Sequence, residues 1–422
     1  MLIRRRERFM KPKRRARRNV LIVSVLFLLA GLLVSLARLS PRADIPAETA
    51  EMAARRANRE TNGFYLLEEM LKRMPAPPTP AWLPMPDDPG TEAYYDPPPG
   101  TLGYRVGVGR LDDDPALLEY VALAEPLSAR VREVLAKPDM LPPPRVSDPE
   151  NTRFGEAFEY SSFHQQLRNL LNLLVARAYT LSGRPETSGE SAQLLRDVFE
   201  LMLRMRDGGV GRMMHVKEPV FFETLARLQP RHQREMIDWA LPLRRLVIPR
   251  ERVEFDVRQH AIQLDRLKKY GSVLRPIEAA AYLRHRALFF RHIDYVYKVA
   301  ELRHYEWRRL IHEDPLYRKL STPELGLNLS AYCSNNTYWA YWMDSCVLVL
   351  AIELYRQENG TLPETLDQLT PDFLAAIPED VFLAPGTPYR YELMEGGYRL
   401  TARDDAKHYS VNIKVPRGES EP

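Results

Sequence analysis

Residues 336–358 read NTYWAYWMDSCVLVLAIELYRQE, an apolar stretch that is interrupted by Asp344 and Glu353. Its hydropathy would allow a membrane span, but each of these two carboxylates would cost about 3 kcal/mol at the centre of a bilayer. A helix that buries its apolar side chains against other protein elements avoids that cost. We therefore predict a core helix here, which Asn359-Gly360 ends.

The sequence after this helix changes to a period of two residues. Three runs alternate apolar with polar residues, and Glu395-Gly396-Gly397 forms a tight turn after the first run. The runs are residues 389–393 (YRYEL), 398–402 (YRLTA) and 408–415 (HYSVNIKV). This pattern predicts three antiparallel strands, on which the long helix can bury its apolar face. We expect an α+β module over residues 331–416 and a flexible tail over 417–422.

The same module resembles the C-terminal half of the major pseudopilins of type II secretion. The resemblance rests on AIELYRQENGTLPETLDQLTPDFLAAIPEDVF at 351–382, PYRYEL at 388–393 and the glycine turn before Tyr398, about 70 residues in all. It implies a long helix ending in Tyr-Arg-x-x-Asn-Gly, a short helix, a loop and a three-stranded sheet. It also implies secretion-system or other envelope proteins as partners. The loop reads Pro378-Glu379-Asp380, where the family has Pro-Asp-Pro.

The N-terminal end carries a signal for membrane topology. Residues 20–37, VLIVSVLFLLAGLLVSLA, contain no charge, and a helix of this length is about 27 Å long, close to the hydrocarbon thickness of a bilayer. The basic residues before it predict that the N-terminus stays cytoplasmic and that the chain beyond Arg38 crosses the membrane. The predicted anchor, residues 19–38, includes Val20, Leu21, Leu26, Phe27, Leu33 and Ala37. The predicted topology residues are Arg4, Arg5, Arg6, Arg8, Lys11, Lys13, Arg14, Arg15, Arg17 and Arg18.

Other interpretations of this end stay open. Ser35-Leu36-Ala37 fits the cleavage site of a signal peptide, although the apolar and basic regions are longer than such peptides usually have, which favours an uncleaved anchor. The pseudopilin family has a glycine before its membrane segment and a glutamate at the fifth apolar position, and both are missing here. We expect a single-pass protein of the bacterial inner membrane.

Composition and charge bound the class of protein. The chain has 422 residues, of which 45% are hydrophobic, so it can bury a sizeable core and is neither a disordered polymer nor a small disulfide scaffold. Its net charge is +4, but residues 1–18 carry +9, which leaves −5 on the other 404 residues. The basic tail adjoins the apolar stretch and holds a single aromatic residue, Phe9. We therefore expect the lipid bilayer, and not nucleic acid, as its partner.

The middle of the chain is predicted to be helical. A short helical segment covers 39–74, and a linker follows over 75–110, with ten prolines between Pro75 and Gly100. Residues 111–330 contain amphipathic patterns typical of an α-helical bundle or irregular solenoid. ARAYTLSGRPE at 176–186 forms a turn between two such helices. The layout resembles that of large membrane-anchored proteins of planctomycete-type bacteria, which implies no function. The fold class is mainly α.

The sequence contains no complete catalytic, cofactor or metal motif. Glu301-Leu302-Arg303-His304 matches half of a di-iron motif, but no second copy exists. His312-Glu313 begins like a zinc-protease motif, yet Leu316 stands where the second histidine is required. His285 and His292 share a helix face about 10 Å apart, too far to bind one metal without other ligands. We predict no catalytic residue, no cofactor and no bound metal.

The chain has two cysteines, Cys333 and Cys346. In an oxidising compartment a disulfide between them would close a loop of about 14 residues and contribute roughly 3 kcal/mol. The alternative is two buried thiols in an aromatic-rich segment. Both interpretations stay open on the sequence alone.

Two functions from different classes follow. The first is a non-enzymatic envelope protein with a cytoplasmic tail, one span, an extracytoplasmic helical body and a pseudopilin-like end that binds a partner. The alternative is a membrane-anchored extracytoplasmic enzyme whose site is built from residues dispersed along the chain. Ionisable side chains that converge in the helical body would favour the enzyme. The sequence leaves the oligomeric state open.

Overall fold

A computed structural model describes most of the chain between residues 48 and 414. The described residues are 23–25, 27–28, 31, 48–75, 115–142, 155–208, 218–245, 253–254, 257–258, 291–300, 302, 306, 309–310, 313–320, 329–402 and 410–414. Two compact units divide the chain. The first unit comprises Met1–Ala47, Val253–Glu301 and Arg309–Ser330, and the second comprises Glu48–Arg252, Leu302–Arg308 and Ala331–Pro422.

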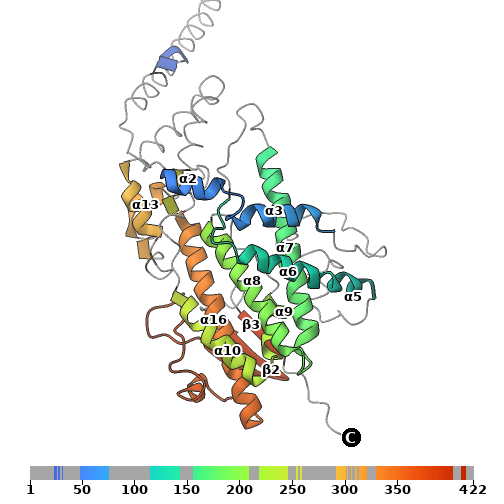
Figure 1. Ribbon diagram of the computed structural model, residues 1–422. Helices are drawn as coiled ribbons and strands as arrows, with labels where there is room; N and C mark the ends of the chain where they lie inside the picture. The colour runs from blue at the N-terminus through green and yellow to red at the C-terminus, as the bar shows by residue number, and fades with distance from the viewer. Residues whose placement is uncertain are drawn as a thin grey trace, which may run out of the picture. The chain divides into compact units, whose positions relative to one another are not determined.

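The second unit is built around an antiparallel helix pair, α7 (Gly155–Ser182) and α8 (Ser188–Gly208) (Figure 1). The turn between them is fixed by side chains near its two ends. The Ser191 hydroxyl donates to the Ala178 carbonyl at 2.7 Å, and the Thr187 hydroxyl donates to the Leu181 carbonyl at 2.7 Å. The turn predicted at Gly183-Arg184-Pro185 is thereby confirmed.

Four shorter helices belong to the same unit: α2 (Ala50–Ala57), α3 (Gly63–Arg73), α5 (Pro115–Ala122) and α6 (Ala124–Leu135). Of these, α3 packs on α6 and α7, and α6 packs on α8. The sequence predicts a single helix over residues 114–137, but the structure breaks it after Ala122. Pro126 explains the break, because its ring has no N–H for the Ala122 carbonyl and collides with it in a continuous helix.

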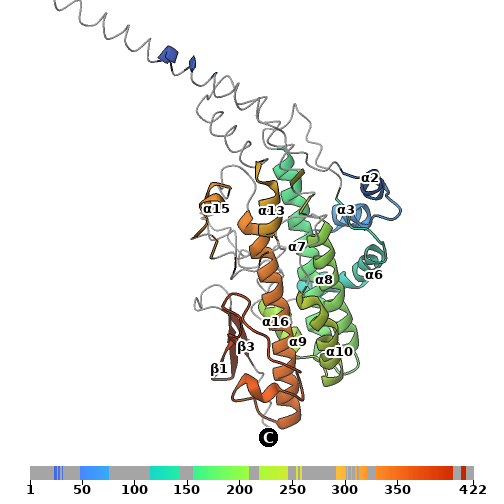
Figure 2. The same cartoon turned by 90° about the vertical axis from the view of Figure 1, so that its left-hand side faces the viewer.

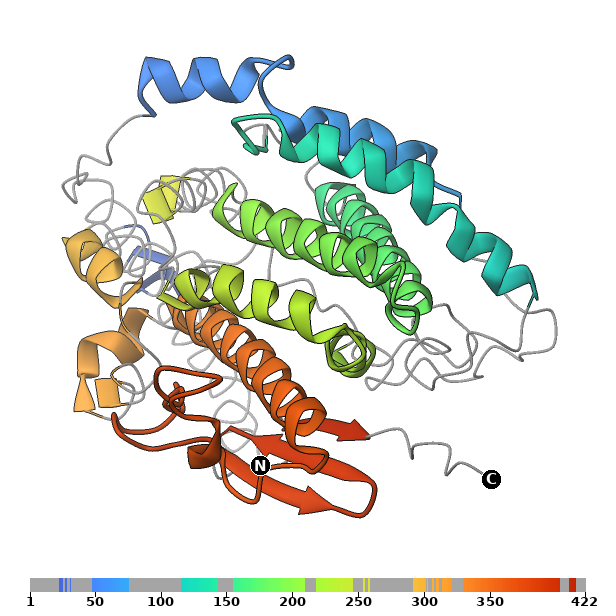
Figure 3. The same cartoon turned by 60° about the horizontal axis from the view of Figure 1, so that its bottom comes forward.

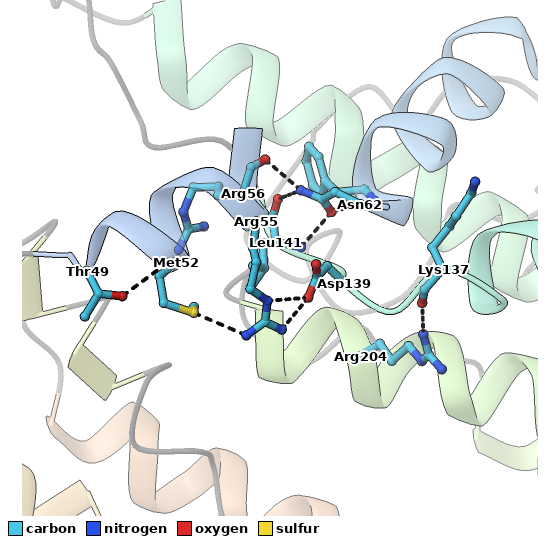
Figure 4. A network of polar contacts seen from close by, with 10 residues as sticks. Thr49, Met52, Arg55, Arg56, Asn62, Lys137, Asp139, Leu141 and Arg204 are labelled. Atoms are coloured by element: carbon cyan, nitrogen blue, oxygen red, sulfur yellow. Dashed lines mark hydrogen bonds and ion pairs between the residues drawn. The ribbon is translucent and has the colours of Figure 1, made fainter. Parts of the chain in front are cut away.

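Asn62 joins the α2–α3 corner to the segment that follows α6 (Figure 4). Its side-chain amide donates to the carbonyls of Arg56 at 2.9 Å and Leu141 at 2.6 Å. Its side-chain oxygen accepts from the backbone N–H groups of Leu141 at 2.9 Å and Phe64 at 3.2 Å. Asp139 forms an ion pair with Arg55 beside it. One buried amide therefore caps α3 and holds a segment 79 residues away.

The next helices are α9 (Glu218–Ala226) and α10 (Pro230–Ala240), followed by the 3-10 helix η2 (Leu241–Arg245). The sequence predicts one helical region over 219–240. The structure divides it because Pro230 occupies the first turn of α10 and places Gln229 in an extended conformation. The Gln229 N–H donates to the Ser188 hydroxyl at 2.9 Å, which ties this corner to the start of α8.

The predicted core helix is α16 (Leu329–Asn359), which starts earlier than residue 336. A 3-10 helix, η4 (Leu366–Leu369), follows it, and then the antiparallel sheet of β1 (Arg390–Met394), β2 (Gly397–Thr401) and β3 (Ser410–Lys414) in the order β1-β2-β3. The sheet lies alongside α16, and β3 is close to α9 (Figures 2 and 3). The expectation of a mainly α chain with a small antiparallel sheet is confirmed.

Aromatic rings on α16 place the C-terminal module in the same core as the helices. Trp342 packs against Phe199 of α8 and Phe221 of α9, with ring centroids 4.3 and 4.7 Å apart. The neighbouring Tyr341 lies 5.8 Å from the ring of Phe382 and 6.5 Å from that of Tyr389. The prediction of separate domains at 111–330 and 331–416 therefore needs correction. Residues 48–252 and 331–422 share one unit because α16 is buried on both sides.

The first unit contains α13 (Ile293–Ala300) and α15 (Pro315–Leu320). The Tyr295 hydroxyl donates to Asp314 at 2.7 Å, and Asp314 also accepts from the Leu316 N–H at 2.8 Å at the start of α15. Burial is the main cause that raises the pKa of Tyr295, and the hydrogen bond to Asp314 raises it further. The same hydrogen bond is the main cause that lowers the pKa of Asp314. Asp314 thus acts as a cap that joins the two helices.

Candidate functional site

Among the described residues, the two carboxylates that interrupt the apolar stretch are the acids whose pKa is raised, in both cases mainly by burial. Asp344 and Glu353 lie on α16, and their side chains are 2% and 1% exposed. A charge in such a place is costly unless it is paired and hydrogen-bonded. Their partners show how the chain meets this requirement.

Asp344 connects three segments of the second unit. Arg244 of η2 forms an ion pair with one carboxylate oxygen. The Tyr389 hydroxyl, immediately before β1, donates to the other oxygen at 3.0 Å. The buried Asp380 of the loop between η4 and β1 lies close enough to act electrostatically on both Asp344 and Tyr389. The carboxylate therefore joins α16 to η2 and to the segment that leads into β1.

Burial dominates the ionisation of Asp344 and raises the pKa of its carboxyl to about 6. Arg244 and the Tyr389 hydrogen bond act in the opposite direction, while the nearby Asp380 raises the pKa further. Burial and the carboxylates of Asp344 and Asp380 raise the pKa of Tyr389 well above its usual value. Tyr389 therefore stays a hydrogen-bond donor throughout the physiological range.

Glu353 is the corresponding group nine residues further along α16. It pairs with Arg356, one turn later, at 2.7 Å, and burial raises its pKa. The Tyr398 hydroxyl of β2 lies beside the carboxylate and lowers the pKa of Glu353. The distance and angle between the two groups do not meet the criteria of a hydrogen bond. Tyr391 of β1 senses the same charge, and its pKa is raised mainly by burial. Glu353 thus lies where α16 faces the first two strands, and its ion-pair partner belongs to α16 itself.

The chemistry open to these groups is proton binding and structural pairing. Asp344 can exchange a proton near pH 6, but its side chain is too buried for a substrate to reach it in this conformation. Within the described part of the chain, no group of three or more histidine, cysteine, aspartate and glutamate side chains is placed to hold a metal ion.

The predicted membrane anchor falls mostly outside the described residues. Of its selected residues, only Phe27 is described; it is helical and 64% exposed. Val20, Leu21, Leu26, Leu33 and Ala37 lie outside, as do all ten topology residues from Arg4 to Arg18. Among the helices that the structure describes, none combines the length and the apolar character needed to cross a membrane.

The structure decides between the two interpretations that the sequence left open for Cys333 and Cys346. Both positions lie on the single helix α16, thirteen residues apart. At 1.5 Å per residue their backbones are about 20 Å apart along the axis, whereas a disulfide requires Cα atoms within about 7 Å. A loop before residue 336 could have brought Cys333 back toward Cys346, but α16 continues to Leu329. Cys346 is buried in the core.

Sequence reasoning missed the role of Asp344 and Glu353, although a signal was present. A carboxylate inside a stretch predicted to be a buried helix requires a partner of opposite charge or a donor. Arg356 is such a partner within the same helix, but Arg244 lies 100 residues before Asp344. No protein-family model, curated protein or solved structure matches this chain.

Proposed function

We propose that this protein is a single-pass, membrane-anchored envelope protein of the bacterial inner membrane with a non-enzymatic, structural or protein-interaction role. In this proposal residues 1–18 stay in the cytoplasm, residues 19–38 span the membrane and the chain after residue 38 lies outside. The pseudopilin-like module at 331–416 is the partner-binding end, and secretion-system or other envelope proteins are the expected partners.

The observation that carries the proposal is the exposure of apolar side chains in the predicted anchor. Val23, Val25, Phe27 and Leu28 are helical and 52%, 46%, 64% and 74% exposed. Burying a side chain of this kind is worth about 1.5–3 kcal/mol, so leaving four of them in water is unfavourable. Lipid removes this cost, and the ten positive charges before the segment orient it.

The non-enzymatic role is supported by the way the buried acids are used. Asp344 holds α16 to η2 through Arg244 and to the segment before β1 through Tyr389, while Glu353 pairs with Arg356 of the same helix. The end of α16 also supports the likeness to pseudopilins. Asn359 donates from its side chain to the Tyr355 carbonyl at 2.9 Å, and Gly360, with φ of 76°, ends the helix.

A topology experiment tests the proposal. A periplasmic-type reporter and a cytoplasmic-type reporter are each fused after Pro422 of the full chain. We expect activity only from the reporter that works outside the cytoplasm, and retention of the protein in membranes after alkaline extraction. A matched variant carries Leu26→Arg and Leu33→Arg, which should release it from the membrane. Cytoplasmic reporter activity, or extraction of the unmodified chain, contradicts the proposal.

One observation favours the alternative, an extracytoplasmic enzyme. Asp344 titrates near pH 6 beside Tyr389 and Asp380, and perturbed carboxylates cluster at active sites. In this alternative the site would be reached only after the module opens, because Asp344 is 2% exposed. An activity screen that compares the wild-type chain with Asp344→Asn would decide it, since a catalytic carboxylate cannot be replaced by an amide.

A further inference from the structure

Residues 379–389 form a loop between η4 and β1, which we call the strap, and its own hydrogen bonds close it. Its two ends meet in the bridge between Glu379 and Pro388, where the Asp380 N–H donates to the Thr387 carbonyl at 2.7 Å. Further inside the strap, the Leu383 N–H donates to the Asp380 carbonyl at 3.1 Å. These bonds join residues of the strap to one another, so a movement of the strap away from α16 leaves them intact.

The strap has a buried underside and an exposed outer side. Asp380, Phe382 and Tyr389 are buried, whereas residues 384–386 are exposed. Tyr341 of α16 lies against the underside, with its ring centroid 5.8 Å from that of Phe382 and 6.5 Å from that of Tyr389. The Tyr389 hydroxyl donates to Asp344 of the same helix at 3.0 Å. The strap therefore covers the part of α16 that carries these two residues.

Three groups from two neighbouring segments face the Asp344 carboxylate. Arg244 belongs to η2, so its ion pair with Asp344 does not require the strap. Tyr389 and Asp380 belong to the strap, and Asp380 brings a second carboxylate toward Asp344. Closure of the strap thus removes Asp344 from water and places a like charge near it. Both effects oppose the ionised form of Asp344.

We propose that the strap is a proton-controlled cover, which protonation of Asp344 holds closed on α16 and which lifts as one piece more often as Asp344 ionises. Lifting returns Asp344 to water, takes Asp380 away and leaves Arg244 in place, and all three favour the carboxylate. The closed strap therefore binds a proton that the open strap releases. In the closed conformation the pKa of Asp344 is about 6, which places the change near neutral pH.

The position of the strap decides how much of α16 the C-terminal module presents. The strap continues directly into β1, and lifting it uncovers the helix around Tyr341 and Asp344. This end of the chain is the partner-binding end in the proposed function, so the pH outside the membrane would control how often the covered face is available. That use rests on the proposed function, whereas the opening itself does not.

Proteolysis of the full-length protein in detergent micelles tests the proposal. Chymotrypsin cleaves after aromatic residues, and it reaches Phe382 only when the strap is open, because Phe382 is buried in the closed conformation. Mass spectrometry gives the initial rate of this cleavage, which is divided by the rate on a short peptide at the same pH. The corrected rate should rise about tenfold between about pH 5 and pH 7.5.

Cleavage after Phe221 in the same digest is the internal control. Phe221 is buried in the helical core, so its cleavage requires global unfolding. Local opening needs less of the structure to unfold, and cleavage after Phe382 should therefore be at least about tenfold faster than cleavage after Phe221. The rate at Phe221 also shows whether each variant remains folded.

Two variants assign the pH dependence. Asp344→Asn does not titrate, so cleavage after Phe382 should no longer depend on pH, and Arg244 keeps contact with water because its side chain is 24% exposed. Asp380→Asn keeps the acceptor for the Phe382 N–H and removes the like charge, so it should reduce the rise to about threefold.

Three results overturn the proposal. They are cleavage after Phe382 that is no faster than cleavage after Phe221, a corrected rate that does not change with pH, and a pH dependence that persists in Asp344→Asn. The rates are measured in detergent and do not depend on the side of the membrane on which the chain lies. Failure of the strap and failure of the proposed topology are therefore distinguishable.

Discussion

The Tyr389 hydroxyl, immediately before β1, donates a 3.0 Å hydrogen bond to the Asp344 carboxylate in the middle of α16. Arg244 holds the other oxygen of this carboxylate from the helical body. A single buried acid therefore connects segments that are 100 residues apart on one side and 45 on the other. Its ionisation has a consequence for stability.

The pH dependence of stability should reveal this acid. Its pKa is raised from the model-compound value of 3.8 to about 6 in the folded protein, so the folded state binds the proton more tightly than the unfolded one. The stabilisation is complete below pH ~4 and is lost as the pH rises through 6. The shift corresponds to about 3 kcal/mol. Urea unfolding at several pH values would measure the free energy of unfolding.

Asp344→Asn provides the matched control. The amide resembles the protonated acid in shape, still offers Tyr389 an acceptor, and does not titrate. The difference in unfolding free energy between wild type and variant should change between pH 4 and 6 and stay constant above pH 7. A difference that is flat across this range would show that the pKa of Asp344 is not raised.

Trp342 should link the unfolding of the helices to that of the sheet. It is 2% exposed and packs against Phe199 and Phe221, so Trp342→Ala should reduce the free energy of unfolding by about 3–5 kcal/mol. α16 packs both against α8 and α9 and against the sheet. In Trp342→Ala, amide hydrogen exchange should therefore increase together in α8 and in β1 and β2.

Leu118→Ala is the control for this variant. Leu118 is an apolar residue that is 40% exposed on α5, and its removal should change the free energy of unfolding by about 0.5 kcal/mol or less. If Trp342→Ala accelerated exchange in α8 while β1 and β2 kept their protection, the shared core would not be a cooperative unit.

The hydrogen bonds of Asn62 should contribute measurably to the free energy of unfolding, because they hold the α2–α3 corner to the segment that follows α6. Asn62→Asp keeps the acceptor for the Leu141 and Phe64 N–H groups but cannot donate to the carbonyls of Arg56 and Leu141. Loss of two buried donors should cost about 2 kcal/mol, and Asn62→Ala should cost more because it also removes the helix cap. Chemical denaturation of the three proteins would give this order. Equal stabilities would show that the network contributes little.

Much of the secondary structure was predictable because it depends on short-range patterns. The turn at 183–185 and the strands near 390, 398 and 410 follow from glycine, proline and alternation within a few residues. The positions at which helices break were harder to predict from the sequence. Pro126 and Pro230 divide regions that look continuous, since apolar spacing alone does not count the lost N–H groups.

The amino-acid sequence by itself determined the mainly helical class, the small antiparallel sheet and the uneven distribution of charge, because each is a property of residue types and their local spacing. Tertiary structure alone decided the partners of Asp344, the single core shared by residues 48–252 and 331–422, and the placement of both cysteines on one helix. Such contacts join residues far apart in the chain, and the requirement to pair a buried charge does not say which arginine will meet it.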